Sequence, residues 1–205
     1  MKKIITFMSL VFIIFMASCN GIDKDPPIII DPNPNEIIDK VDLMIEKIKK
    51  ENNHSVKIDI TLVNRGTETV YIKIDDHIAS YEDFNDFEIY VNEGDLTTTY
   101  SRHGEIWTKT LGPAEESLPI YNDFKDEMFD IVDNVYTLKP TYLGVLDSYF
   151  SQSYDWFNLK ELSLEIKDEM LSTISYRLNI ENFEMIIFMK FYDFNTTEIQ
   201  IPAIS

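Results

Sequence analysis

The chain has 205 residues, a formal net charge of −18 at neutral pH, and a composition that is 44% hydrophobic and 13% aromatic. Such an acidic protein repels phosphate backbones, so we expect no nucleic-acid binding. The hydrophobic and aromatic content excludes a disordered main body. The six glycines are too far apart for a phosphate-binding loop or a dinucleotide fingerprint, which excludes Walker-type and Rossmann-type enzymes.

The chain opens with a basic and then an apolar stretch. Lys2 and Lys3 precede an apolar run over residues 4–16, which is shorter than the roughly 20 residues that a bilayer-spanning helix needs. Small residues, Ala17 and Ser18, end the run directly before Cys19, the only cysteine. This pattern predicts a secretory signal over residues 1–18.

Met16-Ala17-Ser18-Cys19 resembles the lipobox of bacterial lipoproteins, with Met16 where leucine is usual. The resemblance implies that the signal peptide is cut before Cys19 and that Cys19 carries acyl chains such as palmitate. A buried free cysteine, or a plain secretory signal that happens to contain one, is the alternative. Each buried methylene contributes about 0.8 kcal/mol, so such chains would anchor the protein to a membrane. We therefore expect an extracytoplasmic lipoprotein, on the outer face of the cell membrane or on the periplasmic side if the organism has two membranes.

Residues 19–36 contain four prolines, Pro26, Pro27, Pro32 and Pro34. Proline at this density favours an extended chain of about 3.1 Å per residue, so we predict a tether with a reach on the order of 50 Å. The remaining residues, 37–205, suit one domain with a sizeable core.

The domain is predicted to begin with a helix. Apolar residues recur at helical spacing at Ile37, Ile38, Val41, Met44, Ile45 and Ile48. This spacing predicts an amphipathic helix of about 14 residues whose apolar stripe needs a partner.

The period then changes to two, which is typical of strands. Alternating segments occupy residues 56–62, 70–75, 87–91, 96–100 and 106–109, with turns at 64–67, 92–95 and 102–105. Strands joined by such turns predict an antiparallel meander with one face on a core.

Residues 112–153 differ from the meander. Helix-like apolar spacing at 118–132 and 142–150 surrounds a short predicted strand at 135–138. Three strands follow at 156–166, 171–180 and 183–192, with a last short piece at 197–201. The predicted class is α+β: an antiparallel sheet covered by an N-terminal helix and a helical insertion.

The strand 183–192, FEMIIFMKFY, is apolar on both faces. Its odd positions are apolar, and Ile186, Phe188 and Tyr192 add apolar side chains to the other face. Such a strand must be covered on both sides or face a cavity that something apolar fills.

Three stretches resemble the LolA-like lipoprotein-carrier fold, which lipid-binding lipoproteins of the LppX and LprG type share. They are residues 88–108, 162–180 and 191–202; in the last, Asn195 stands where glycine is commoner. The resemblance implies a strongly curved, unclosed sheet, a half-barrel whose concave face holds acyl chains under helical lids. Its candidate ligand-cavity residues are Trp107, Met185, Ile187, Met189 and Phe191. Ordinary core packing is the alternative for each of them.

Few residues in the sequence suggest catalysis or metal binding. His54, His77 and His103 are scattered, and Asp75-Asp76-His77 has no second cluster at ligand spacing. No G-x-S-x-G motif occurs. We therefore predict no enzyme activity, no catalytic residue, no metal and no cofactor. Two functions remain open: a monomeric carrier of a lipid or other amphiphile, or a surface lipoprotein with an interaction or structural role and no ligand.

Overall fold

The computed structural model describes residues 40–50, 52–114, 124–146, 157–180 and 183–204. The predicted signal peptide, Cys19 and the tether lie outside these residues. Within these residues, helix α2 (Lys40–Lys50) precedes the strands. The strands are β1 (Asn53–Leu62), β2 (Gly66–Asp75), β3 (Ile78–Glu82), β4 (Phe87–Glu93), β5 (Leu96–His103), β6 (Ile106–Pro113), β7 (Phe129–Val132), β8 (Val135–Leu138), β9 (Phe157–Lys167), β10 (Met170–Ile180) and β11 (Phe183–Tyr192).

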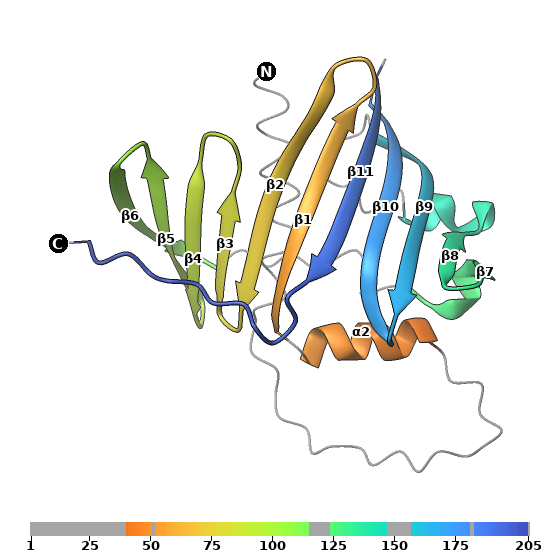
Figure 1. Cartoon of the computed structure of the whole chain (residues 1–205), viewed down its shortest axis with the longest axis horizontal. Helices are drawn as coiled ribbons and strands as arrows, with labels where there is room; N and C mark the ends of the chain where they lie inside the picture. Colours follow the sequence, from red (N-terminus) through yellow and green to blue (C-terminus); the bar gives the residue numbers. More distant parts are fainter. Residues whose placement is uncertain (1–39, 51, 115–123, 147–156, 181–182, 205) are drawn as a thin grey trace, which may run out of the picture.

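All of these strands form one antiparallel sheet in the order β6-β5-β4-β3-β2-β1-β11-β10-β9-β8-β7 (Figure 1). The N-terminal meander and the C-terminal strands meet where β1 pairs with β11 in the middle of the sheet. The sheet is open and is not strongly curled. The predicted unclosed antiparallel sheet is thus confirmed, and the predicted strong curvature is not.

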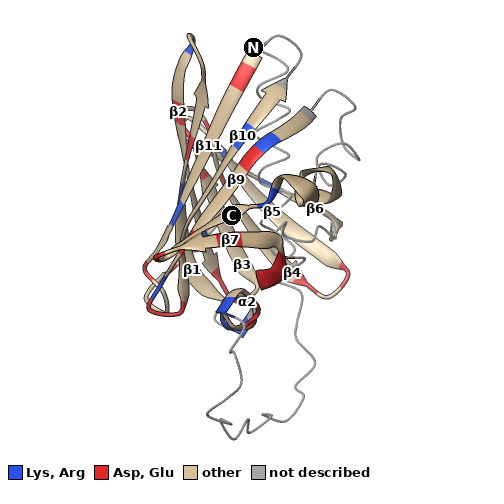
Figure 2. Cartoon of the chain, turned by 90° about the vertical axis from the view of Figure 1, so that its right-hand side faces the viewer, with Lys and Arg blue, Asp and Glu red and all other residues tan. Residues whose placement is uncertain are grey.

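Helix α2 crosses the sheet at the end where β9 turns into β10 (Figures 1 and 2). An ion pair between Lys47 and Glu169 joins the helix to that turn. The backbone N–H groups of Lys40 and Val41 donate to the two carboxylate oxygens of Asp126, each at 3.0 Å. A carboxylate at a helix N-terminus satisfies amides that have no partner within the helix and matches the helix dipole.

We call the face of the sheet that carries α2 the inner face and the opposite one the outer face. The helix buries its predicted stripe there, since Val41, Met44, Ile45 and Ile48 are all at most 5% exposed. They belong to the same core as the inner-face side chains of β1, β2 and β9 to β11. The predicted amphipathic helix is confirmed over its described residues.

The insertion is only partly helical, so the prediction of a helix over residues 118–132 is wrong for its last part. Short 3-10 turns occupy Asp126–Met128 and Pro140–Tyr142, and residues 129–132 form β7, which pairs with β8. The reason is a tight turn at Asp133, whose φ is 56°, which folds Phe129 back against Leu138. Residues 143–146 are helical, and residues 115–123 and 147–156 lie outside the described part.

Two further features differ from prediction. Strand β3 was not predicted, although it is needed to connect β2 to β4 in the sheet. Residues 197–201 form no strand; they belong to a C-terminal segment, Asp193–Ile204, that runs across the outer face of the sheet (Figure 1). No helix among the described residues has the length and apolar character to cross a membrane.

Candidate functional site

The predicted cavity residues of β11 lie together on the inner face. Met185, Ile187, Met189 and Phe191 are 1–4% exposed. Each is directly paired with an inner-face residue of β1: Leu62, Ile60, Ile58 and Val56, respectively. The first three also pair with Leu178, Tyr176 and Ile174 of β10. The four residues are therefore the centre of the apolar surface of the inner face.

Trp107 does not lie on the same face as these four residues, so its prediction as a cavity residue is wrong. It lies on β6, six positions along the sheet from β11. Directly paired residues share a face of a sheet. Such pairs connect Trp107 to β11 through Arg102, Phe87, Glu82, Tyr71, Lys57 and Lys190. Lys190 alternates with Met189 and Phe191, so Trp107 is on the outer face. Strand β3 lies in this path, so without it the register between the two strands could not be predicted.

Trp107 has its own neighbours on the outer face. Its ring meets that of Phe87 edge-on, with the centroids 5.6 Å apart. The guanidinium of Arg102 lies 4.9 Å from the Phe87 centroid and 5.8 Å from the Trp107 centroid. Both distances are within the range of a cation–π interaction, so a small aromatic and cationic cluster forms at this end of the sheet.

The core beneath the inner face contains several methionines, whose side chains are flexible. The Tyr176 hydroxyl donates a hydrogen bond to the Met189 Sδ atom at 3.1 Å. Met185, Met44 and Met128 are also buried in this core. Because the methionine side chain is flexible and polarisable, such a surface adapts to apolar groups of different shape.

The outer face of β1 is polar and locally charged. The Lys57 Nζ atom lies 2.8 Å from an Asp59 carboxylate oxygen, and the Thr69 hydroxyl donates to the other oxygen at 2.6 Å. Burial alone would raise the pKa of Asp59, but these two hydrogen bonds lower it below its usual value near 3.8. The hydrogen bond with Asp59 raises the pKa of Lys57. Asp59 is therefore an ionised, structural group of this face.

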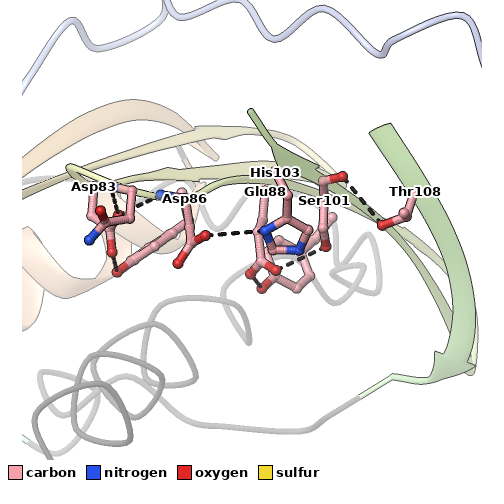
Figure 3. Close-up of polar contacts among 9 residues, drawn as sticks. Asp83, Asp86, Glu88, Ser101, His103 and Thr108 are labelled. Atoms are coloured by element: carbon pink, nitrogen blue, oxygen red, sulfur yellow. Dashed lines mark hydrogen bonds and ion pairs between the residues drawn. The ribbon is translucent and has the colours of Figure 1, made fainter. Parts of the chain in front are cut away.

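The inner face changes character beyond β3, where it becomes polar (Figure 3). The Tyr81 hydroxyl donates to Asp83 at 2.8 Å. Ser101 donates to the Glu88 carboxylate at 2.9 Å, and Tyr90 donates to the same carboxylate. Nothing in the sequence pattern predicted this surface, because its hydroxyl residues look like the solvent side of ordinary strands.

The three histidines lie in separate places. His54 is fully buried on β1, with its ring 5.9 Å from that of Phe191 and 5.7 Å from that of Phe194. His77 and His103 are exposed beside Asp76 and Asp86, at 3.2 and 3.4 Å. Within the described residues, no three His, Cys, Asp or Glu side chains are grouped so that they could hold a metal ion.

No family model matches the sequence, and no curated protein matches it. The resemblance to LolA-like carriers and the assignment of Cys19 therefore stay predictions, and the site rests on the geometry of the inner face.

Proposed function

We propose that this protein is a membrane-anchored, extracytoplasmic lipoprotein that carries or sequesters a lipid or other amphiphile on the inner face of its sheet. One observation supports the proposal most: the inner face carries a contiguous patch of buried apolar side chains across five neighbouring strands, bordered by His54 on β1 and Glu68 on β2. The buried side chains are Val70, Ile72 and Ile74 on β2; Val56, Ile58 and Ile60 on β1; Met185, Ile187, Met189 and Phe191 on β11; Ile174, Tyr176 and Leu178 on β10; and Leu159, Leu162, Leu164 and Ile166 on β9.

The position of α2 indicates where an acyl chain would lie. The helix covers the end of the strands near Leu171, whereas Leu178 lies seven residues further along β10. At about 3.3 Å per residue this separation is roughly 23 Å. Leu62, which is paired with Met185 at that far end, is only half-buried. We place the acyl chain at this far end, beyond α2, where it would insert against side chains that are already buried in the unliganded protein, Leu178 at 0% and Met185 at 2% exposure.

The energetics favour such a ligand. Each methylene transferred from water contributes about 0.8 kcal/mol, so a chain of about ten buried methylenes gains roughly 8 kcal/mol before its ordering costs. Met185 and Met189 can adjust their rotamers to such a chain. The predicted acyl anchor at Cys19 and the predicted tether would hold this surface close to a source of lipid.

The proposal is tested with the full chain carrying Cys19→Ser, so that only non-covalently bound lipid is measured. The purified protein is incubated with vesicles, separated from them and analysed by native mass spectrometry. We expect added mass that organic-solvent extraction removes. A clean unliganded mass after contact with vesicles would refute the carrier function.

A matched pair of variants locates the ligand. Ile187→Trp adds bulk to the inner face, and Phe188→Trp adds it to the neighbouring, 39% exposed position on the outer face. We expect Ile187→Trp to lose most of the bound lipid and Phe188→Trp to keep it. Far-UV circular dichroism of both variants checks that the fold is retained.

A second function, interaction with another protein, is favoured by exposed apolar side chains at the edge strand β6. Ile106 is 70% exposed and Leu111 is 65% exposed. A photo-crosslinking residue at position 111 tests this function in intact cells. A discrete crosslinked product, absent when the residue is placed at the exposed position Asp130, would support it.

A further inference from the structure

We propose that the inner face of β3 to β6 binds the headgroup of the amphiphile, and that this headgroup is an uncharged sugar. The inference rests on the proposed carrier function and adds the ligand class. It follows from the way the inner face divides into an apolar and a polar part, with β3 at the boundary.

The polar part is made of alternate residues on three strands. Directly paired residues continue the inner face from Tyr81 on β3 to Glu88 on β4 and from there to Ser101 and Thr108. The inner-face residues beyond β3 that can form side-chain hydrogen bonds are Glu88, Tyr90, Asn92, Thr97, Thr99, Ser101, His103, Thr108 and Thr110. They form a mainly hydrogen-bonding surface next to the apolar part, in which Ile106, 70% exposed, and Gly112 on β6 are the positions without a polar side chain.

The outer side of β4 is apolar, which is the reverse of β1. Ile89 and Val91 alternate with Glu88 and Tyr90, yet they are 1% and 5% exposed. They are not part of the inner core. The C-terminal segment passes on their side of the sheet, whereas Glu88, Ser101 and His103 lie on the other side (Figure 3). Strand β4 therefore buries its apolar side chains on the outer face, which lets its inner face carry polar groups.

Two tyrosines mark the boundary between the parts. Tyr81 is 8% exposed and belongs to the core, and Tyr90 packs against that core from its edge. Their hydroxyls point to carboxylates, Asp83 and Glu88. Burial, and then the hydrogen bond to Asp83, raise the pKa of Tyr81, so its hydroxyl stays protonated. Tyr81 pairs with Ile72, at the end of β2 nearer to α2, so an amphiphile with its headgroup here would run its chain diagonally across β2 and β1 toward Leu62 and Met185.

The charged side chains on this polar surface determine which headgroups it can bind. Among the inner-face positions of β3 to β6, all of which the structure describes, none is Lys or Arg, while Glu88 contributes a carboxylate. Such a surface repels a phosphate and offers acceptors to groups that donate hydrogen bonds. Sugar hydroxyls both donate and accept, so they suit a mixture of carboxylate, amide and hydroxyl groups. An anionic phospholipid headgroup does not.

The test compares two lipids with identical acyl chains, a diglucosyl diacylglycerol and a phosphatidylglycerol. The full chain with Cys19→Ser is equilibrated with vesicles that contain both in equal amounts, and the retained lipid is quantified. We expect the glycolipid to be enriched about tenfold, the ratio that a difference of 1.4 kcal/mol produces. Equal retention, or enrichment of the phospholipid, would overturn the headgroup proposal while leaving the carrier function intact. Retention of neither lipid would overturn both.

Two adjacent exposed residues on opposite faces of β6 provide a matched pair. Thr110 points to the inner face, and Leu111 points to the outer face. We expect Thr110→Lys to reduce the glycolipid preference at least about threefold, because it adds a cation beside the headgroup. Leu111→Lys adds the same charge on the outer face and should leave the preference unchanged. An equal effect of both variants would contradict the assignment of this surface.

Discussion

Asn53 and Thr197 form a two-way hydrogen-bonded pair that attaches the C-terminal segment to the first strand. The Asn53 Nδ2 atom donates to the Thr197 carbonyl, and the Asn53 Oδ1 atom accepts from the Thr197 N–H, both at 2.8 Å. The Thr197 hydroxyl adds a 3.0 Å contact with the Ser55 hydroxyl, in a buried position. The side-chain amide of Asn53 thus replaces the backbone of a neighbouring strand and fixes the direction in which the segment leaves.

Asn53→Ala should release the C-terminal segment. It removes both bonds to Thr197, and we expect a loss of about 1–3 kcal/mol of unfolding free energy because partly buried backbone groups lose their partners. Carboxypeptidase digestion of the C-terminus should become faster. Asn85→Ala, at an exposed position, is the control. An unchanged digestion rate for Asn53→Ala would show that the pair does not hold the segment.

Ile89 should depend on the C-terminal segment for its burial. We expect Ile89→Ala to cost about 2–4 kcal/mol in the whole chain and distinctly less once residues 198–205 are deleted. A double-mutant cycle by urea unfolding measures this coupling. Ile58→Ala, in the inner core, should add to the deletion within about 0.5 kcal/mol. Additivity for both residues would mean that the segment does not cover Ile89.

The two faces of β11 should respond differently to charge. Met189 is 1% exposed and Phe188 is 39% exposed, although they are neighbours in the chain. Met189→Lys places an unpaired cation in the core and should cost more than about 4 kcal/mol. Phe188→Lys should cost less than about 1 kcal/mol. Thermal unfolding of the two variants measures this difference in stability. Similar melting temperatures would contradict the assigned register.

Asp59 should stabilise the protein only in its ionised form. Its folded-state pKa lies below its usual value, so its contribution is complete above about pH 4 and is lost as the pH falls through the folded-state pKa. At pH 7 we expect Asp59→Asn to cost about 0.5–1 kcal/mol, because the pair with Lys57 is partly exposed. The difference from wild type should shrink toward pH 3. Asp130→Asn is the exposed control, and a pH-independent difference for Asp59→Asn would contradict the linkage.

Cys19→Ala should abolish membrane anchoring. If the Met16-Ala17-Ser18-Cys19 motif directs acylation, labelled palmitate is incorporated into the native chain and not into the variant. The native protein should partition into the membrane fraction and the variant into the soluble fraction. Membrane association of the unlabelled variant would show that something other than acylation retains the protein.

The sequence predicted most strands because their apolar residues alternate. Residues 171–180 and 183–192 are close to the observed bounds of β10 and β11, and the turn at Gly94, whose φ is 63°, lies where Asn92-Glu93-Gly94-Asp95 indicated it. Strand β3 was missed because it has five residues, with Ala79 and Ser80 where large apolar side chains would reveal alternation. Because β3 was not predicted, the face of the sheet on which Trp107 lies could not be predicted either.

The candidate site was predictable only in its apolar part. Alternation grouped Met185, Ile187, Met189 and Phe191 correctly on one face, since every second residue of a strand points the same way. The polar part depends on β4, where the polar residue Glu88 points to the inner face and the buried apolar residue Ile89 points to the outer face. The C-terminal segment, which passes on that side of the sheet (Figure 1), is more than a hundred residues away in the chain, so no local sequence pattern could predict this arrangement.

The pairing of β1 with β11 also has a consequence for biogenesis. Ser55 lies opposite Tyr192, so the seam at the centre of the sheet joins the beginning of the described domain to its end. A chain emerging from a translocation channel N-terminus first would hold β1 with one open side until its last residues arrive. Contacts of such long sequence separation form slowly, and an unpaired strand attracts other chains in the meantime. If the protein is exported as proposed, a chaperone that shields β1 on the way would therefore matter more to it than to a protein built from local hairpins alone.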